Sequence, residues 1–566
     1  MKKIIPVLIA IVLIIVVAAI GFGAKLAEKY SYSKERADLT EYFGITGEDD
    51  VPVILQDEQV EERARLWDGV CYFDLATVHK YFNDRFYEDK KEKLLLYALP
   101  DAVVRVPIGE QTVSTGGNDG SRDYVIARYE GDVLYIAADF VKEYSNFSYT
   151  LYTEPNHMQV YTEWTERQTA TVLKDTQVRY QGGIKSDILT DLPKGSKVVI
   201  LEEMETWTKV KTEDAFIGYI ENKKLSEHTA ETPLPVTDYV EPVYASNTRD
   251  HKINLAWHAV ASVEGNDTLS SVMAGTKSIN VISPTWFALN DNAGNFTSIA
   301  SSDYVARAHD MGLEVWGLVD NFTNAGVDTY EVLAGTSTRT YLINGLVDAA
   351  LQYGLDGINI DFENISLDAG EPFVQFIREL SIPCREHGIV LSVDNYVPMG
   401  YTDHYNRKEQ GIVADYVIIM GYDEHYRGSE TAGSVASINF VEKGIADTVA
   451  EVPAHKVINA IPFYTRIWET KGTTVESQAV GMEIAQQYIA DHGITTAWDE
   501  TTCQNYGEYQ SGDSYYQVWL EDADSIRVKL NIMSKYGIAG VAEWKLGFEV
   551  PSIWDVIEEY MNQPMG

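Results

Sequence analysis

The chain has 566 residues, which is too long for one ordinary hydrophobic core and predicts several domains. Its formal net charge is −40, and so acidic a surface disfavours nucleic acid as a partner because it repels phosphate backbones. Its three cysteines lie far apart and its histidines lack metal-ligand spacing, so we expect no metal, no cofactor and no disulfide framework.

The N-terminus has the pattern of a membrane anchor. Lys2 and Lys3 precede an uncharged apolar run over residues 4–24, close to the roughly 20 residues that a helix needs to cross a bilayer. We predict one transmembrane helix within residues 1–25, with the rest of the chain outside the cytoplasm because the positive flank is N-terminal. The alternative is a signal cleaved near Gly23, which would give a secreted protein.

Residues 40–165 are predicted to form a small α+β domain. Short β-rich runs alternate with turn signals, and a helical stretch covers residues 138–144. The order VLYIAADFVKEY, residues 133–144, resembles the N-terminal domain of copper amine oxidases. That resemblance implies no copper chemistry, because the domain recurs in bacterial envelope proteins without it.

Residues 169–226 contain short strands separated by turns, which predicts a small β-barrel. The order LPKGSKVVILEE, followed by TWTKVKT and GYI, resembles a bacterial SH3-like domain, a family often attached to cell-wall enzymes. Two roles remain open for it: a spacer between the membrane and the C-terminal domain, or a module that binds glycan or peptide. The proline-bearing stretch over residues 227–250 is predicted to be a linker.

Residues 251–562 are predicted to form a (β/α)₈ TIM barrel, a fold that typically needs about 250 residues or more. Extra length between the seventh and eighth strands, around residues 498–519, predicts a small α+β insertion. The prediction rests on eight apolar strand-like runs with helical segments between them: INLAWHAV, INVISPTWF, LEVWGLVDN, GINIDFEN, IVLSVDNYVP, YVIIMGYDEH, VINAIPFY and GVAEWKLGF.

The fourth run, LDGINIDFEN, carries the clearest chemistry. Asn359, Asp361 and Glu363 occur at period two, so a strand turns all three toward the barrel interior, at the end where barrel active sites lie. Carboxylates buried there are costly unless they are hydrogen-bonded or functional. Together with aromatic strand ends they indicate a glycosidase, because acid catalysis and sugar stacking need these residue types.

The segment DGINIDFE, residues 356–363, closely resembles the fourth-strand signature DGxDxDxE of family 18 glycoside hydrolases, and the resemblance extends over about residues 251–562. It implies that Glu363 is the general acid/base and that Asp361 orients and stabilises the substrate acetamido group. Asp356 and Gly357 would be structural supports at the strand entrance.

Later strands extend the resemblance. The motif MGYD matches the sixth-strand motif whose tyrosine, here Tyr422, hydrogen-bonds the acetamido carbonyl, with Met420 and Asp423 beside it in the substrate site. Trp544 falls where the family places a tryptophan under the sugar ring, and Trp286 is a further expected sugar-binding residue. A row of exposed aromatics suited to chitin could be formed by Trp286, Trp316, Tyr396, Tyr405 and Trp468.

One position departs from the family motif. Asn359 stands where the family has its middle aspartate, so it cannot share or store a proton. We expect its amide to lie in the substrate site and to donate to Asp361, which would keep Asp361 ionised. The asparagine form resembles a branch found in bacterial cell-wall and spore-cortex N-acetylglucosaminidases.

The resemblance implies retaining, substrate-assisted hydrolysis of β-1,4-linked N-acetylglucosamine glycans, with peptidoglycan as the first candidate substrate. The alternatives are a chitinase or endo-β-N-acetylglucosaminidase acting on chitin or N-glycans, and a non-catalytic lectin on the same barrel. The expected partners are therefore a cell-wall or other N-acetylglucosamine-containing polysaccharide and, through the N-terminal helix, the membrane.

Overall fold

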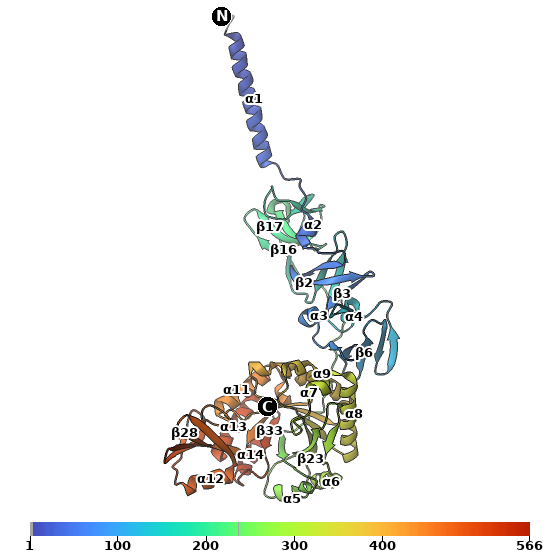
Figure 1. The fold of residues 1–566 in the computed structure, drawn as a ribbon. Helices are drawn as coiled ribbons and strands as arrows, with labels where there is room; N and C mark the ends of the chain where they lie inside the picture. Colours follow the sequence, from blue (N-terminus) through green and yellow to red (C-terminus); the bar gives the residue numbers. More distant parts are fainter. Residues whose placement is uncertain (1–3, 236, 566) are drawn as a thin grey trace. The chain divides into compact units, whose positions relative to one another are not determined.

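The computed structural model describes residues 4–235 and 237–565, so Lys2 and Lys3 lie outside the described residues. The chain divides into two compact units (Figure 1). The first unit comprises residues 1–86, 106–113 and 120–241, and the second comprises residues 87–105, 114–119 and 242–566.

The first unit begins with helix α1, Ile5–Tyr30, which carries the predicted anchor. None of its residues is buried against the rest of the described chain. At about 1.5 Å per residue the helix spans roughly 39 Å, against a hydrocarbon core of about 30 Å. Length and composition suit a membrane span, and they suit a signal sequence equally well.

Two sheets of seven strands complete the first unit. One has the order β11-β12-β1-β2-β3-β10-β9 and packs with the short helices α3, Leu75–Tyr81, and α4, Ala138–Glu143. Its strands are β1 Asp50–Leu55, β2 Glu58–Trp67, β3 Val70–Asp74, β9 Ala127–Glu130, β10 Val133–Ala137, β11 Ser148–Tyr152 and β12 His157–Tyr161.

The second sheet is the predicted SH3-like domain, with the order β15-β14-β18-β17-β16-β13-β19. Alternating apolar residues such as Val178, Val198, Val210 and Ile220 form its core. Its elements are β13 Arg167–Thr171, β14 Thr176–Arg179, β15 Ile188–Leu192, β16 Lys197–Glu203, β17 Trp207–Thr212, β18 Ile217–Glu221, the 3₁₀ turn η1 Asn222–Lys224 and β19 Thr229–Glu231.

A segment from within the predicted α+β region, residues 87–105, belongs to the second unit. It contributes β4, Tyr87–Asp89, and β5, Leu94–Ala98, to a small sheet. The Tyr87 hydroxyl donates to the carbonyl of Ala334 at 2.9 Å, and the backbone N–H of Thr336 donates to Asp89 at 2.6 Å. These buried bonds tie the segment to barrel helices, and its local strand pattern gave no sign of that partner.

The second unit is built around the predicted barrel of eight parallel strands. β20 pairs with both β21 and β33, which closes the sheet. The strands are β20 Ile253–His258, β21 Val281–Leu289, β23 Glu314–Asp320, β24 Gly357–Asp361, β25 Val390–Tyr396, β26 Tyr416–Met420, β27 Val457–Pro462 and β33 Gly540–Trp544. The principal helices are α6 Ser302–Asp310, α8 Thr336–Tyr353, α9 Leu367–His387, α10 Arg407–Val413, α11 Ile438–Val449, α13 Ala523–Tyr536 and α14 Ile553–Met561.

The predicted insertion lies between β27 and β33 and is larger than the sequence indicated. It has five antiparallel strands in the order β29-β28-β32-β31-β30 and the helix α12, Met482–Asp491, which packs on them. The strands are β28 Tyr464–Lys471, β29 Thr474–Gly481, β30 Ala497–Asp499, β31 Gln504–Ser511 and β32 Ser514–Leu520.

Large side chains fill the lower barrel interior, so the open space is confined to the C-terminal ends of the strands. The rings of Trp316 and Tyr416 stack there with centroids 5.5 Å apart, and both are almost fully buried. Gly357 leaves the room for them, since a Cβ at this position would lie 2.6 Å from the Trp316 ring and 3.0 Å from the carbonyl oxygen of Val390.

We expect Gly357→Ala to destabilise the barrel by about 1–3 kcal/mol, because the added methyl overpacks a site with no free volume. Thermal unfolding of the parent and of Gly357→Ala would measure this loss of stability. Gly400→Ala is the matched control in the same unit, since a Cβ there meets nothing within 4 Å. An unchanged melting temperature for Gly357→Ala would contradict the packing role.

Candidate active site

A pocket of about 270 Å³ opens at the C-terminal ends of the barrel strands. Side chains from seven of the eight barrel strands, or from the residues just after them, converge on it, as the parallel topology dictates. Its lining residues are Trp257, Phe322, Asp361, Glu363, Asp394, Tyr396, Met420, Tyr422, Asp423, Tyr464 and Trp544. Most of the predicted site residues are therefore brought together, whereas Asn359 and Trp286 are not among them.

Glu363 follows β24 and is held on two sides. The Tyr396 hydroxyl donates to its carboxylate Oε2 at 2.7 Å. Asn321 clamps its backbone, accepting from the N–H at 2.8 Å and donating to the carbonyl at 2.9 Å. Burial raises the pKa of Glu363 above its usual value, against the lowering effect of the Tyr396 hydrogen bond. A positioned carboxyl with a raised pKa holds its proton to a higher pH than an exposed glutamic acid does.

Asp361 and Asp394 lie side by side on adjacent strands. Ile360 pairs with Val393 in the β24–β25 register, so the next residue on each strand is an aspartate facing the barrel interior. Oδ1 of Asp361 and Oδ2 of Asp394 are buried and have no hydrogen-bond partner among the described residues. Burial raises the pKa of both aspartates well above the usual value. Nearby carboxylates, Asp394 first, add to this rise for Asp361, whereas for Asp394 the Asn359 hydrogen bond opposes it.

Asn359 does not hold Asp361 as expected. It is fully buried below the pocket, and its Nδ2 donates to Asp394 at 2.8 Å instead. Its Oδ1 accepts from the Trp257 indole at 2.9 Å and from the Ser283 hydroxyl at 3.1 Å. The expected hydrogen bond from Asn359 to Asp361 is therefore wrong. The amide donates to Asp394 on the next strand, so it does not keep Asp361 ionised.

Aromatic and phenolic groups form the remaining walls. Trp544 is half-buried and meets Trp257 edge to face, with ring centroids 5.9 Å apart. Tyr464, from β28 of the insertion, donates its hydroxyl to Asp423 at 2.6 Å. Burial raises the pKa of Tyr422 well above its usual value, so its hydroxyl stays a donor at neutral pH.

Trp286 is misassigned by the sequence. It is 2% exposed, and its indole donates to Asn266 at 2.8 Å on the helix side of the barrel. Of the aromatics proposed as a chitin-binding row, Trp316 and Trp468 are also core residues, at 0% and 1% exposed. Tyr405 is buried as well, which leaves Tyr396 alone in the pocket.

Sequence reasoning did not assign Trp257, Asp394 or Tyr464 to the site. The first two stand at strand ends, in INLAWHAV and LSVDNYVP, so the rule that found Glu363 could have found them. Tyr464 ends the seventh run, VINAIPFY, two residues after β27, so the same rule applies to it, although it is also the first residue of β28 in the insertion. Asp356 lies at the strand entrance, where its carboxylate accepts from the N–H of Val315 at 2.8 Å. Within the described ranges no cluster of three histidine, cysteine or acidic residues could hold a metal.

The closed barrel and its carboxylate-lined pocket define a barrel of the glycoside hydrolase class. Residues 272–549 match the family model described as glycosyl hydrolases family 18, and residues 174–226 match the bacterial SH3 domain. The chain therefore carries a glycosyl hydrolase family 18 domain preceded by a bacterial SH3 domain.

Similar proteins agree with the domain assignment. The cortical fragment-lytic enzyme of Bacillus subtilis is 26% identical over 241 residues, 41% of this chain and 56% of that protein. The uncharacterized glycosylase YvbX of the same organism is 26% identical over 295 residues, 50% of this chain and 84% of that protein. A chitinase structure from Chromobacterium violaceum, 24% identical, aligns with a TM-score of 0.50 over 55% of this chain and 99% of its own. This chain thus spans little more than half of the lytic enzyme, and the chitinase structure shows the fold alone.

We expect Asp361→Asn to raise the melting temperature at about pH 7. Because the folded pKa of Asp361 lies above the unfolded one, the folded state binds this proton more tightly, and stability falls as pH rises between the two values. The gain from the substitution should shrink at about pH 4, where the acid is protonated in the folded state.

Thermal unfolding at both pH values measures the effect, at about 2–4 °C per kcal/mol for a domain of this kind. Asp403→Asn, at an exposed carboxylate, is the control. A loss of stability in Asp361→Asn at neutral pH would contradict the prediction, because it would mean that the ionised Asp361 carboxylate stabilises the folded state.

Proposed function

We propose that this protein hydrolyses β-1,4-linked N-acetylglucosamine glycans of the cell wall, with peptidoglycan as its substrate. The single observation that carries the proposal is the pairing of Glu363, held by Tyr396, with the buried Asp361 in one pocket of a family 18 barrel. In this proposal Glu363 is the protonated carboxyl for the leaving oxygen, and Asp361 is the acceptor for the acetamido N–H.

Hydrolysis would follow the substrate-assisted route. Glu363 donates its proton to the leaving glycosidic oxygen while the 2-acetamido oxygen of the substrate attacks the anomeric carbon, giving an oxazolinium ion. Asp361 accepts the acetamido N–H and Tyr422 donates to the acetamido oxygen. Glu363 then takes a proton from the water that opens the ring. Trp544 and Trp257 supply the apolar floor under the sugar.

Asp361 and Asp394 would share one proton during this cycle. A proton on Oδ2 of Asp394, donated to Oδ1 of Asp361, gives a partner to both buried oxygens that lack one. Asn359 supports this arrangement by donating to the other oxygen of Asp394. Asp361 then keeps its other oxygen as an acceptor for the substrate, whichever of the two carboxyls carries the shared proton.

Localisation at the membrane is the second part of the proposal. Helix α1 would cross the cell membrane once, with the SH3 domain and the barrel on the extracytoplasmic side. Secretion after signal cleavage is the alternative. The choice of peptidoglycan is supported by the lytic activity in the name of the Bacillus subtilis relative and by the attached bacterial SH3 domain.

A chitinase or an endo-enzyme on N-glycans is the competing function, because the same pocket chemistry acts on any 2-acetamido sugar. The burial of Trp286, Trp316 and Trp468 removes most of the aromatic row expected for chitin. A lectin would not need a carboxyl at Glu363 with a raised pKa.

Digestion of purified peptidoglycan and of chitin oligomers, with mass spectrometry of the new reducing ends, tests the proposal. N-acetylglucosamine ends from peptidoglycan support it, and muramic acid ends reject the bond assignment. Cleavage of chitin alone would reject peptidoglycan as the substrate and support a chitinase.

Glu363→Gln should lower turnover by at least about 10³-fold with little loss of glycan binding, since the amide keeps the shape but carries no acidic proton. Hydrolysis rate and binding of an uncleaved oligomer are measured on the same preparation. Activity within a few-fold of the parent would remove Glu363 from its role as the general acid/base and would overturn the proposed mechanism.

Asp394→Asn should move the acidic limb of the pH–rate profile to lower pH, because the like charge that helps to raise the pKa of Asp361 is gone. Tyr396→Phe is the contrasting variant. Loss of its hydrogen bond raises the pKa of Glu363, so the alkaline limb should move to higher pH. Equal shifts of both limbs in both variants would argue that the two carboxyl groups do not act separately.

A further inference from the structure

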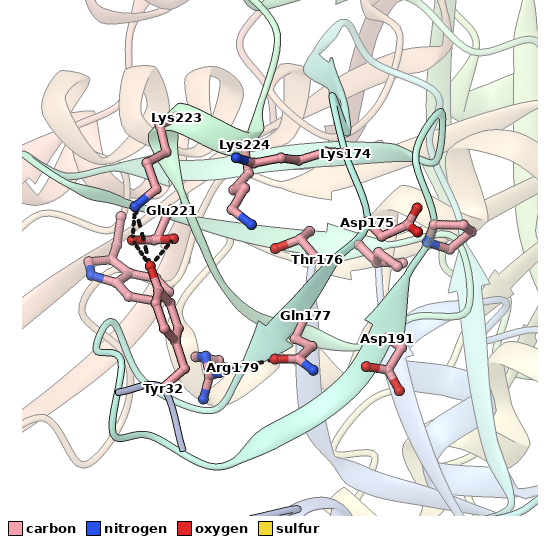
Figure 2. A pocket seen from close by; sticks show the side chains of 13 residues that line it. Tyr32, Lys174, Asp175, Thr176, Gln177, Arg179, Asp191, Glu221, Lys223 and Lys224 are labelled. Atoms are coloured by element: carbon pink, nitrogen blue, oxygen red, sulfur yellow. Dashed lines mark hydrogen bonds and ion pairs between the residues drawn. The ribbon is translucent and has the colours of Figure 1, made fainter. Parts of the chain in front are cut away.

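A second pocket, of about 740 Å³, lies in the SH3 domain of the first unit. Figure 2 shows its walls, formed by β14 and β15, by the end of β18 with the turn η1, and by Tyr32 from the segment that follows α1. Lys174, Lys223 and Lys224 stand along one wall (Figure 2). The proposed hydrolysis makes no use of this pocket.

The cations of this pocket outnumber its free anions. Glu221 already pairs with Lys223 at 2.7 Å and accepts from the Tyr32 hydroxyl at 2.9 Å (Figure 2). Asp191 pairs with Arg36, which lies outside the lining. Two of the three lining carboxylates are thus neutralised, and Asp175 is the third.

Three lining cations have no carboxylate partner within 4 Å among residues 4–235 and 237–565: Lys174, Lys224 and Arg179. The buried Arg179 guanidinium donates only to neutral oxygens, those of Ser186 at 2.6 Å and Ser33 at 3.1 Å and the side chain of Gln177 at 3.0 Å. Lys224 is partly buried, and desolvation together with the charge of Lys174 lowers its pKa. The ammonium groups of Lys174 and Lys224 thus share one pocket, and a bound anion would reduce the repulsion between them. This cluster of positive charge stands in a chain whose net charge is −40.

The pocket adjoins the end of the proposed membrane helix. The N–H of Ser33 donates to the carbonyl of Ile184 at 2.8 Å, and Lys185 donates to the carbonyl of Glu28, so the domain is bonded to the last turn of α1 and the residues after it. The apolar run ends at Ala24, and six further helical residues add about 9 Å. Since the headgroup layer is roughly 5–7 Å thick on each side, the helix ends about 2–4 Å outside this layer, and Tyr32 follows just beyond it.

We propose that this pocket binds the phosphodiester headgroup of an anionic phospholipid in the leaflet that α1 leaves, with Lys174 and Lys224 as its ligands. Lysine ammonium groups suit phosphate oxygens as point charges, and basic residues beside a membrane helix gain affinity from anionic lipid. Tyr30 and Tyr32 fit the aromatic residues that gather at a membrane interface. The inference rests on the proposal that α1 crosses the membrane.

Hydrogen exchange of the full-length protein in lipid nanodiscs tests this binding. Discs of phosphatidylcholine are compared with discs holding up to about one third phosphatidylglycerol. In the parent, phosphatidylglycerol should slow exchange in residues 172–179 and 221–225. The double variant Lys174→Gln, Lys224→Gln should need about tenfold more of this lipid or more for half of that protection, since each lysine contributes about fivefold.

Lys209→Gln, on β17 and outside the lining, is the matched control and should behave as the parent. Unchanged exchange in β16 and β17 shows that each variant is folded, and Lys174→Gln alone should give an intermediate shift. Failure of the protein to co-elute with discs would overturn the membrane span and, with it, the inference. If the protein co-elutes, the pocket assignment alone is overturned by either of two results: no protection by phosphatidylglycerol, or protection by inorganic phosphate or an acidic peptide instead of the lipid.

Discussion

The burial of Asp361, Asp394 and Glu363 in one pocket is the constraint on which the catalytic half of the molecule depends. Each carboxylate loses hydration, and the charges of other carboxylates nearby raise the free energy of its ionisation further. The donors that meet them are few: a tyrosine hydroxyl on Glu363 and an asparagine amide on Asp394. The pocket therefore retains protons at a pH where exposed carboxyls would have lost them.

A small polar network below the pocket makes this crowding possible. Asn359 joins Trp257 on β20, Ser283 on β21 and Asp394 on β25 through three hydrogen bonds, so one side chain fixes four strands. An aspartate could accept from the indole and the hydroxyl, but it could donate to Asp394 only when protonated. The asparagine of the motif is thus bonded to the aspartate of the next strand, Asp394, and the proposed shared proton lies between Asp394 and Asp361.

The sequence predicted the barrel and the fourth-strand carboxylates because both depend on local periodicity. The eight apolar runs and the alternation of Asn359, Asp361 and Glu363 are properties of single strands. The role of Asp394 depends on the register between β24 and β25, which no single strand encodes. The sequence therefore placed Asn359 in the right strand and gave it the wrong partner.

The tryptophans show a second limit to predicting the site from the sequence. Trp544 and Trp286 both stand near strand ends, yet one lines the pocket and the other is packed against Tyr304 on the helix side. One face of a barrel strand meets the interior and the other meets the helices, and both are apolar, so composition cannot separate them. The segment over residues 87–105 is similar, because its strands are local but its partners are helices more than 200 residues away.

The two pockets gain their affinity from opposite electrostatic arrangements. In the barrel, like charges are desolvated together, and the protons that they retain lower the net charge of the pocket. A pocket of this kind suits the neutral sugar of the proposed function. In the SH3 domain, cations remain without counter-charges in a chain with 85 acidic residues available, so their isolation is not a matter of composition. A headgroup bound there would add its charge where the chain itself supplies none, and it would hold the SH3 domain at the membrane surface.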